Sequence, residues 1–164
     1  MEIREATDSA AWDSFLSTQK YRPFMQSWTM GEVYRDIGEE PIRLEMIENN
    51  QIVGICQALV INARRGKHLV VPYGPITDNR QPTTQLIEAL KKEAVKRQCC
   101  FIRLSPFWEA GSELIPGSSP APLHLLAEHI WYINLKETSE EEILKNMRKN
   151  TRNLIRRARK DGVT

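Results

Sequence analysis

Asp78 is the first residue in this sequence whose type and position suit catalysis. It follows the segment Tyr73-Gly74-Pro75 and precedes a helix-like pattern. A carboxylate held at the end of a strand can orient or deprotonate an amine. An Asp in the sequence Thr-Asp-Asn-Arg is also ordinary turn chemistry. The residues alone leave both interpretations open.

A run of basic residues near the C-terminus is the second candidate. Residues 139–164 contain 8 Lys and Arg against 4 Asp and Glu, whereas the rest of the chain contains 15 against 17. At about 100° per residue, most of these cations lie on one side of a predicted helix and the apolar residues on the other. The basic side comprises Lys145, Arg148, Lys149, Arg152, Arg156, Arg159 and Lys160; the other comprises Ile143, Leu144, Met147, Thr151, Leu154, Ile155 and Ala158.

This distribution predicts a core-facing side and a side for a phosphate-bearing partner. The alternative is a solvated helix whose charges only maintain solubility. Ser139 and Glu142 have the spacing of a capping box, and Gly162 fits a helix C-terminus. We therefore predict one helix over residues 139–160.

The bulk composition bounds the class of protein. The chain of 164 residues, 41% hydrophobic and 27% charged, is typical of one globular domain. No apolar run reaches the ~20 residues that span a bilayer, and the N-terminus has no apolar region of a secretory signal. Cys56, Cys99 and Cys100 have no metal-ligand spacing. They predict reduced thiols in a cytoplasmic protein.

The elements that must position these residues follow from periodicity and turn signals. A strand over residues 2–6 precedes a helix over residues 9–18 that Asp8 can cap. A second helical pattern ends at Gly38. Strands follow at residues 42–48, 52–61 and 68–72, joined by polar turns, then a helix from Pro82 to about Arg97. Strands at residues 100–104 and 130–135 flank a long loop, residues 105–122, of the kind that is functional or mobile.

This order predicts an α/β (α+β) protein with a mixed, mostly antiparallel sheet flanked by helices. The strand at residues 100–104 is too apolar to suit a sheet edge. Common nucleotide, metal and nucleophile motifs are absent. His68 lies in a strand, where a structural role is expected, and His124 and His129 do not share a helical face.

Several segments, in this order, resemble the FemABX aminoacyltransferases, the bacterial peptidoglycan-bridge enzymes with a duplicated GNAT-like fold. The segments are Phe24-Met25-Gln26-Ser27, Tyr73-Gly74-Pro75-Ile76 with Asp78, residues 101–106 (FIRLSP), residues 131–135 (WYINL), and residues 149–158 (KNTRNLIRRA) with Gly162-Val163. No single segment is diagnostic, and the last is the strongest. Together they extend over nearly the whole chain.

The resemblance implies transfer of an aminoacyl group from aminoacyl-tRNA to an amine on the stem peptide of a UDP-linked or lipid-linked peptidoglycan precursor. Asp78 would be catalytic, and Gln26 and Tyr73 would line the substrate cleft. Arg148, Lys149, Arg152 and Arg156 would bind phosphate or tRNA. Trp28 and Trp131 would be core or cleft wall. No cofactor is implied beyond the donor, and no acetyl-CoA loop is present. A cytoplasmic location, with peripheral contact at the inner face of the membrane, would suit these partners.

The sequence departs from the family in two ways. Family members often carry a Lys one or two turns after the Gln-Ser motif, where this chain has Tyr34 and Arg35. Those two residues are therefore the substrate-binding candidates in that region. Members are also about twice as long, with a second GNAT-like half. The expected organisation is a GNAT-like subdomain over residues 1–137 and a basic helix over residues 138–164 that begins the missing half, as a fragment inactive by itself.

Two other functions stay open from the sequence. One is a GNAT-like N-acyltransferase that acts on a different amine. The other is an RNA-binding module without catalysis, in which the basic helix makes the contacts. The amino acid transferred, the acceptor position and the oligomeric state do not follow from these residues.

Overall fold

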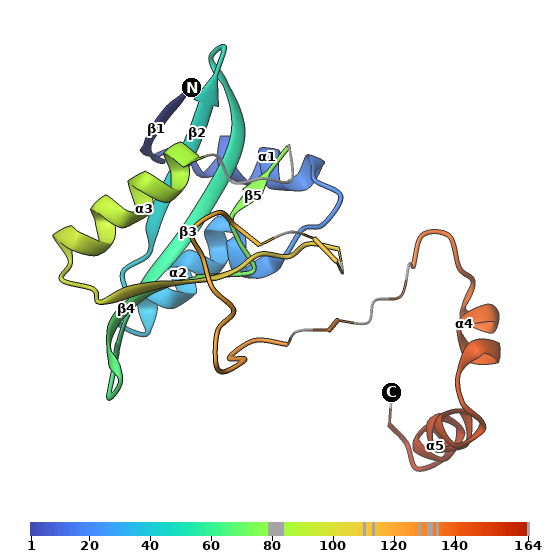
Figure 1. Ribbon diagram of the computed structural model, residues 1–164. Coiled ribbons are helices and arrows are strands. Elements are labelled where there is room, and N and C mark those ends of the chain that lie inside the picture. Colours follow the sequence, from blue (N-terminus) through green and yellow to red (C-terminus); the bar gives the residue numbers. More distant parts are fainter. Residues whose placement is uncertain are drawn as a thin grey trace. The chain divides into compact units, whose positions relative to one another are not determined.

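The computed structural model describes residues 1–78, 84–109, 111–112, 114–127, 129–130, 133 and 135–163. The chain divides into two compact units, Met1–Leu126 and Ala127–Thr164. The first unit holds the sheet and the helices around it, and the second holds two short helices (Figure 1).

A six-stranded sheet, counted over the described residues, forms the centre of the first unit. Its strands are β1 (Glu2–Glu5), β2 (Ile42–Glu48), β3 (Gln51–Ala63), β4 (Gly66–Pro72), β5 (Ile76–Thr77) and β6 (Phe101–Ser105). The order is β1-β2-β3-β4-β6, and β5 pairs with the first half of β3. All pairs are antiparallel except the parallel pair β4–β6. The predicted mixed, mostly antiparallel α+β fold is confirmed.

Helices cover both faces of this sheet (Figure 1). On one face, Leu86, Leu90 and Ala94 of α3 (Thr84–Lys96) pack against alternate residues of the strands. The strand residues in this core are Ile42, Leu44, Met46, Cys56, Ala58, Leu69 and Val71. On the other face, Trp12, Phe15 and Leu16 of α1 (Ser9–Thr18) pack against Ile55 and Ile76. A short 3-10 helix, η1 (Phe24–Gln26), leads into α2 (Trp28–Asp36).

Capping and turn residues in the sequence predicted most of these helices and strands correctly. Asp8 accepts hydrogen bonds from the backbone N–H groups of Ala10 and Ala11, so it caps α1 as predicted. Asn49 and Asn50 have φ values of 49° and 62°. Two successive positive φ values match the twist of a two-residue hairpin, and Asn tolerates them. The three cysteines are free thiols.

Three expectations for the sheet need correction or stay untested. The short strand β5 was missed because two residues are too few to show a period. The strand Phe101–Ser105 is the last of the described strands in the sheet order, and its expected internal position stays a prediction. Of the predicted strand 130–135, residues 131, 132 and 134 lie outside the described part. None of the other residues described there is in a strand.

The second unit contains α4 (Glu140–Asn146) and α5 (Lys149–Lys160). The capping box of Ser139 and Glu142 is present. The prediction of one continuous helix is wrong, because Met147 is extended, with φ −72° and ψ 152°. At this break the side chain of Arg152 donates to the carbonyl of Lys145, which the end of α4 leaves free. No residue of either helix is buried, so the expected core-facing side is not seen within this unit.

Candidate active site

Asp78 lies in a cavity of about 270 Å³ in the first unit. Three segments that are far apart in the sequence form it: the end of α1 with the residues after it, β5 with its flanks, and the residues after β6. The lining residues are Gln19, Lys20, Tyr21, Pro75, Ile76, Thr77, Asp78, Phe107, Trp108 and Glu109. We call this cavity the aromatic cleft.

The rings of Tyr21 and Phe107 form one wall of the aromatic cleft, and the ring of Tyr73 packs against Phe107. The ring centroids of Tyr21 and Phe107 are 5.3 Å apart, and those of Tyr73 and Phe107 are 5.5 Å apart, both edge to face. Tyr73 has a φ of 50° at the end of β4, and this backbone turn directs the chain toward β5. Tyr73 therefore packs against Phe107 from outside the cavity, since Phe107 lines the cavity and Tyr73 does not.

The Asp78 carboxylate is exposed and held from one side. Its Oδ1 atom accepts a hydrogen bond from Nε2 of Gln19 at 3.0 Å. Its backbone N–H donates to the carbonyl of Val53 at 3.2 Å, which extends the pairing of β5 with β3. The rigid sheet and the Gln19 amide thus fix the orientation of the carboxylate. An oriented carboxylate with an exposed oxygen is what proton removal from an amine requires.

A second carboxylate, Glu109, lies in the same cleft. Nζ of Lys20 is 2.7 Å from Oε1 of Glu109 and 5.1 Å from the ring centroid of Tyr21. The hydrogen bond to Glu109 raises the pKa of Lys20 above its ordinary value. The cleft therefore combines carboxylates with aromatic faces, and both groups favour a bound ammonium.

Gln26 is fully buried and serves the framework beneath this region. Its Nε2 donates to the carbonyls of Gln57, at 3.0 Å, and Pro72, at 2.7 Å. Its Oε1 accepts from the backbone N–H of Gln57 at 2.8 Å. The β3–β4 pairing ends at Leu59 and Val70, so the Gln26 amide bridges the two strands where they separate. Gly74 packs on this amide, and a Cβ there would lie 2.6 Å from the Gln26 Cδ.

A buried polar network connects this framework to α2. Arg43 is 5% exposed and donates to Oε1 of Gln57 and to Oε1 of Glu32, at 3.1 Å and 2.7 Å. Its guanidinium lies 3.8 Å from the ring centroid of Trp28. The hydrogen bond from Arg43 lowers the pKa of Glu32. Trp28 therefore packs against this network, in agreement with the core or cleft-wall position expected from the sequence.

Tyr34 and Arg35 lie on α2 and do not line the aromatic cleft. Burial raises the pKa of the Tyr34 hydroxyl. Arg35 pairs with Glu32 and, at 3.0 Å, with Glu40. Gln26, Tyr73 and Asp78 therefore lie on or beside the segment of residues 73–78. Tyr34 and Arg35 lie elsewhere in the first unit.

The other four predicted residues lie in the second unit, on or beside α5. Arg148 precedes the helix without capping it through its side chain. Nη1 of Arg152 donates to the carbonyl of Lys145 at 2.8 Å, so Arg152 satisfies a carbonyl that the end of α4 leaves free. Nη1 of Arg156 is 3.3 Å from Oδ1 of Asn153. Lys149 is exposed in the first turn of α5.

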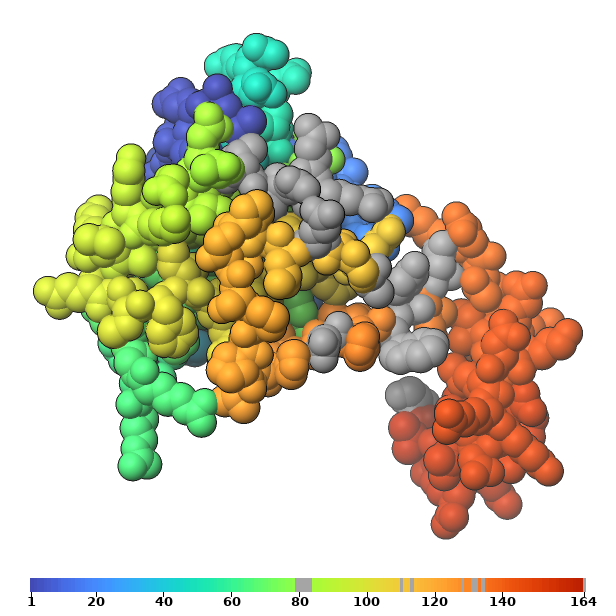
Figure 2. Space-filling view, in the orientation of Figure 1, coloured from blue at the N-terminus to red at the C-terminus, as the bar shows by residue number. Residues whose placement is uncertain are grey.

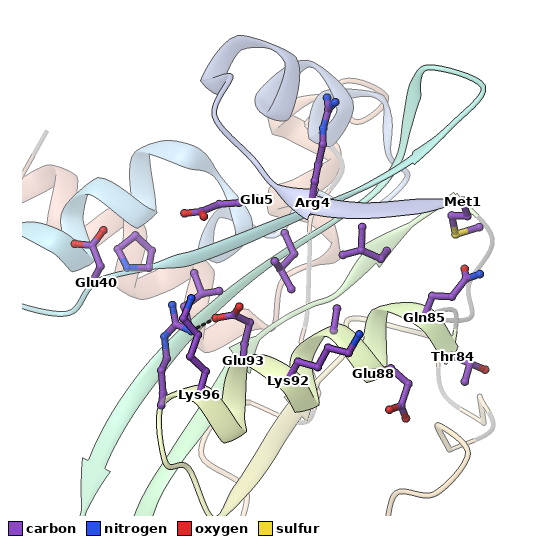
Figure 3. A pocket seen from close by; sticks show the side chains of 16 residues that line it. Met1, Arg4, Glu5, Glu40, Thr84, Gln85, Glu88, Lys92, Glu93 and Lys96 are labelled. Atoms are coloured by element: carbon purple, nitrogen blue, oxygen red, sulfur yellow. Dashed lines mark ion pairs between the residues drawn. The ribbon is translucent and has the colours of Figure 1, made fainter.

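A larger groove of about 620 Å³ lies between β1 and α3 (Figure 3). Apolar side chains, among them Ile3, Ile42 and Leu44, form its floor, and charges of both signs surround it. The Glu93–Arg97 ion pair occupies part of its wall (Figure 3). None of the predicted site residues lines this groove.

Sequence reasoning missed most residues of the aromatic cleft, namely Gln19, Lys20, Tyr21, Phe107, Trp108 and Glu109. The one available signal was the position of the last three in the long loop after β6, which was expected to be functional. Over the described residues, no cluster of three or more His, Cys, Asp or Glu could hold a metal ion. None of the described helices is long and apolar enough to cross a membrane.

The fold is GNAT-like, as its similarity to two solved structures shows. The crystal structure of FemX superposes with a TM-score of 0.59 at 18% identity, covering 67% of this chain and 28% of that one. A ribosomal-protein-alanine N-acetyltransferase from Brucella melitensis biovar Abortus 2308 superposes with a TM-score of 0.51 at 11% identity, covering 79% of this chain and 99% of that one. At these identities the likeness concerns the fold. The chain spans little more than a quarter of the FemX length.

The sequence profile of the FemAB family matches residues 7–117. The chain belongs to the FemAB family. The matched range contains the complete aromatic cleft and the Gln26 framework, and ends before the basic helices. No curated protein sequence matches the chain.

Proposed function

We propose that this chain is part of an aminoacyltransferase that extends the stem peptide of a peptidoglycan precursor. Membership of the FemAB family and the acyltransferase fold support a transferase. The observation that carries the proposal is the Asp78 carboxylate, which an amide and a strand hold in an aromatic cleft suited to an amine.

The proposed reaction forms one amide bond and breaks one ester bond. The acceptor amine attacks the ester carbonyl of aminoacyl-tRNA, and the 3′-terminal sugar oxygen of the RNA leaves with a proton. Asp78 would accept the first proton, which the acceptor ammonium loses to become the neutral nucleophile. The second proton, lost from the nitrogen as the amide forms, would go to the leaving sugar oxygen. The remaining contribution of the protein is alignment of the two substrates. No cofactor is needed for this reaction.

The acceptor amine is charged before it reacts, so the aromatic cleft must first bind an ammonium. Asp78 and the ring of Phe107 suit that state, whereas Glu109 and Tyr21 already contact the ammonium of Lys20. The phosphates of the precursor and of the tRNA would then contact basic side chains outside the cleft. Arg148, Lys149, Arg152 and Arg156 remain our candidates for that role, because the second unit carries a concentrated positive charge.

The location follows from these substrates. Aminoacyl-tRNA and UDP-linked precursors are cytoplasmic, and a lipid-linked precursor would bring the enzyme to the inner face of the membrane. We therefore propose a cytoplasmic enzyme with a peripheral membrane contact when the acceptor is lipid-linked.

A label-transfer assay tests this function. The natural gene product is incubated with a mixture of radiolabelled aminoacyl-tRNAs and a UDP-linked precursor, and the precursor is separated and counted. Label on the precursor, lost in the Asp78→Asn variant, is the expected result. Turnover of an acyl thioester with no label on the precursor would identify an N-acyltransferase for another amine. RNA binding without either turnover would indicate a non-catalytic module.

A further inference from the structure

The β3–β4 hairpin carries a group of cations in the first unit that the proposed function does not use. Its turn is Arg64-Arg65, between the paired residues Ala63 and Gly66. Neither arginine has a positive φ, and Gly66 takes φ 116° to close the turn. The hairpin projects from the body of the first unit, in green in Figures 1 and 2. We call Arg64 and Arg65, at the tip of this hairpin, the hairpin patch.

The charges of the hairpin patch are not compensated. Arg64 and Arg65, like Lys67 of β4, make no side-chain hydrogen bond or ion pair with any described residue. Four exposed cations of the first unit pair with a carboxylate, namely Arg4 with Glu45, Lys20 with Glu109, Arg35 with Glu32 and Lys91 with Glu88. Among the described residues, Lys92 and Lys96 of α3 are unpaired as well, but Glu88 and Glu93 lie on the same helix. Residues 60–72 and 98–108 contain no Asp or Glu. The hairpin and the strand beside it therefore form a region of one charge sign.

An aromatic ring lies at the base of the same hairpin. Phe101 opens β6, pairs with His68 of β4, and is 41% exposed. The two rings stack with centroids 4.5 Å apart and planes 12° from parallel. His68 is buried, so it holds Phe101 in place while the other side of that ring faces outward. The backbone N–H of Cys100 donates to the carbonyl of Lys67 at 2.7 Å, which ties the ring to the hairpin.

We propose that the hairpin patch and Phe101 form a binding surface for RNA. Two adjacent arginines can each bind two phosphate oxygens, and an exposed ring on a rigid support accepts a stacked base. The Arg64-Arg65 turn carries no large apolar side chain that could insert between lipids, which favours RNA over an anionic membrane. The surface lies in the first unit and includes no residue of the basic helix α5. It concerns binding and not transfer, so it stands or fails independently of the proposed function.

Fluorescence anisotropy tests the inference with the whole chain. The probes are a fluorescein-labelled single-stranded 12-nucleotide RNA and a labelled RNA stem–loop, titrated between 50 and 200 mM KCl. The R64A/R65A variant should bind about five- to tenfold more weakly, and the slope of log affinity against log salt should fall by about 2. Phe101→Leu keeps the apolar volume and should weaken binding of the single strand more than that of the stem–loop.

Lys91→Ala is the matched control, because Lys91 is an exposed cation that already pairs with Glu88 at 2.7 Å. It should change affinity less than Arg64→Ala or Arg65→Ala. Circular dichroism spectra check that each variant folds. Unchanged RNA affinity and salt slope in R64A/R65A would overturn the inference. Co-sedimentation with phosphatidylglycerol vesicles that R64A/R65A loses, with RNA affinity unaffected, would overturn it too and assign the patch to a membrane.

Discussion

Gln26 and Asp78 are polar residues of two segments that resemble the same family. The structure gives them opposite surroundings. Gln26 is 0% exposed, and both polar atoms of its amide are hydrogen-bonded to strand backbone. Asp78 is exposed in the aromatic cleft, and among the residues that the structure describes its side chain has one hydrogen-bond partner, Gln19. The Tyr73-Gly74-Pro75 segment links the two, since Gly74 packs on Gln26 and β5 then leads to Asp78.

This difference in burial shows two reasons why a polar residue can occur at the site: one supports the fold, and the other is available for chemistry. Gln26 replaces the ladder hydrogen bonds that β3 and β4 lose where they separate, so its amide is committed to the fold. Asp78 contributes little to the fold and leaves a carboxylate oxygen exposed. Changes at the first residue should therefore act through stability, and changes at the second through chemistry. The following variants test that division.

Gln26→Leu should have the largest effect on stability. The leucine fills similar volume but leaves the N–H of Gln57 and the carbonyls of Gln57 and Pro72 without their partner. Each buried unsatisfied group costs about 1–3 kcal/mol, so we expect a loss of about 3–5 kcal/mol in the free energy of unfolding. Urea unfolding followed by circular dichroism measures it. A loss below about 1 kcal/mol would show that the amide does not hold the strands.

Gly31→Ala should be the next most damaging change. A Cβ at Gly31 would collide with the guanidinium of Arg43 and the amide of Gln57, both of which belong to the buried network. We expect a loss of about 2–4 kcal/mol, because the network cannot move without breaking its hydrogen bonds. Thr29→Ala, an exposed change on the same helix, is the control and should stay within about 0.5 kcal/mol of the unaltered chain.

Asp78→Asn should separate chemistry from stability. The asparagine keeps the shape and can still bind Gln19, so the free energy of unfolding should change by less than about 0.5 kcal/mol. The transfer rate should fall by about 10²-fold or more, since an amide cannot accept the amine proton. Thermal unfolding and label transfer on the same preparation measure both. An unchanged rate would remove Asp78 from the chemistry.

Glu32→Gln should have the smallest effect, and the size of that effect depends on pH. The hydrogen bond from Arg43 lowers the pKa of Glu32 below 4.5 in the folded chain. The native chain should therefore be more stable than the variant above pH 4.5. This difference should disappear as the pH falls through the folded pKa of Glu32. Urea unfolding of both proteins between pH 3 and 7 tests it, and a difference that grows on acidification would contradict the assignment.

The sequence was sufficient where structure depends on neighbours along the chain. Asp8, Asn49 and Asn50 act on backbone groups within three residues, so their caps and turns could be predicted. The break between α4 and α5 could not be predicted, because no Pro or Gly marks it. The hydrogen bond from Arg152 to the carbonyl of Lys145 favours it.

The aromatic cleft shows why the site was only partly predictable. Asp78 and Tyr73 were found because they belong to a short motif that resembles a family. Phe107 meets Tyr21 and Tyr73 only after the sheet has assembled, and no spacing in the sequence records that contact. Gln26 was assigned to the cleft from its motif, whereas its burial depends on the separation of two strands later in the chain.

Titration of the ¹⁵N-labelled chain with a UDP-linked precursor tests the central claim, that the aromatic cleft binds the amine substrate. Backbone amide shifts should change at residues 19–21, 76–78 and 107–109, and Asp78→Asn should weaken the response. Residues 85–97, along the groove between β1 and α3, should not respond. Shifts confined to that groove, with the cleft unaffected, would contradict the account.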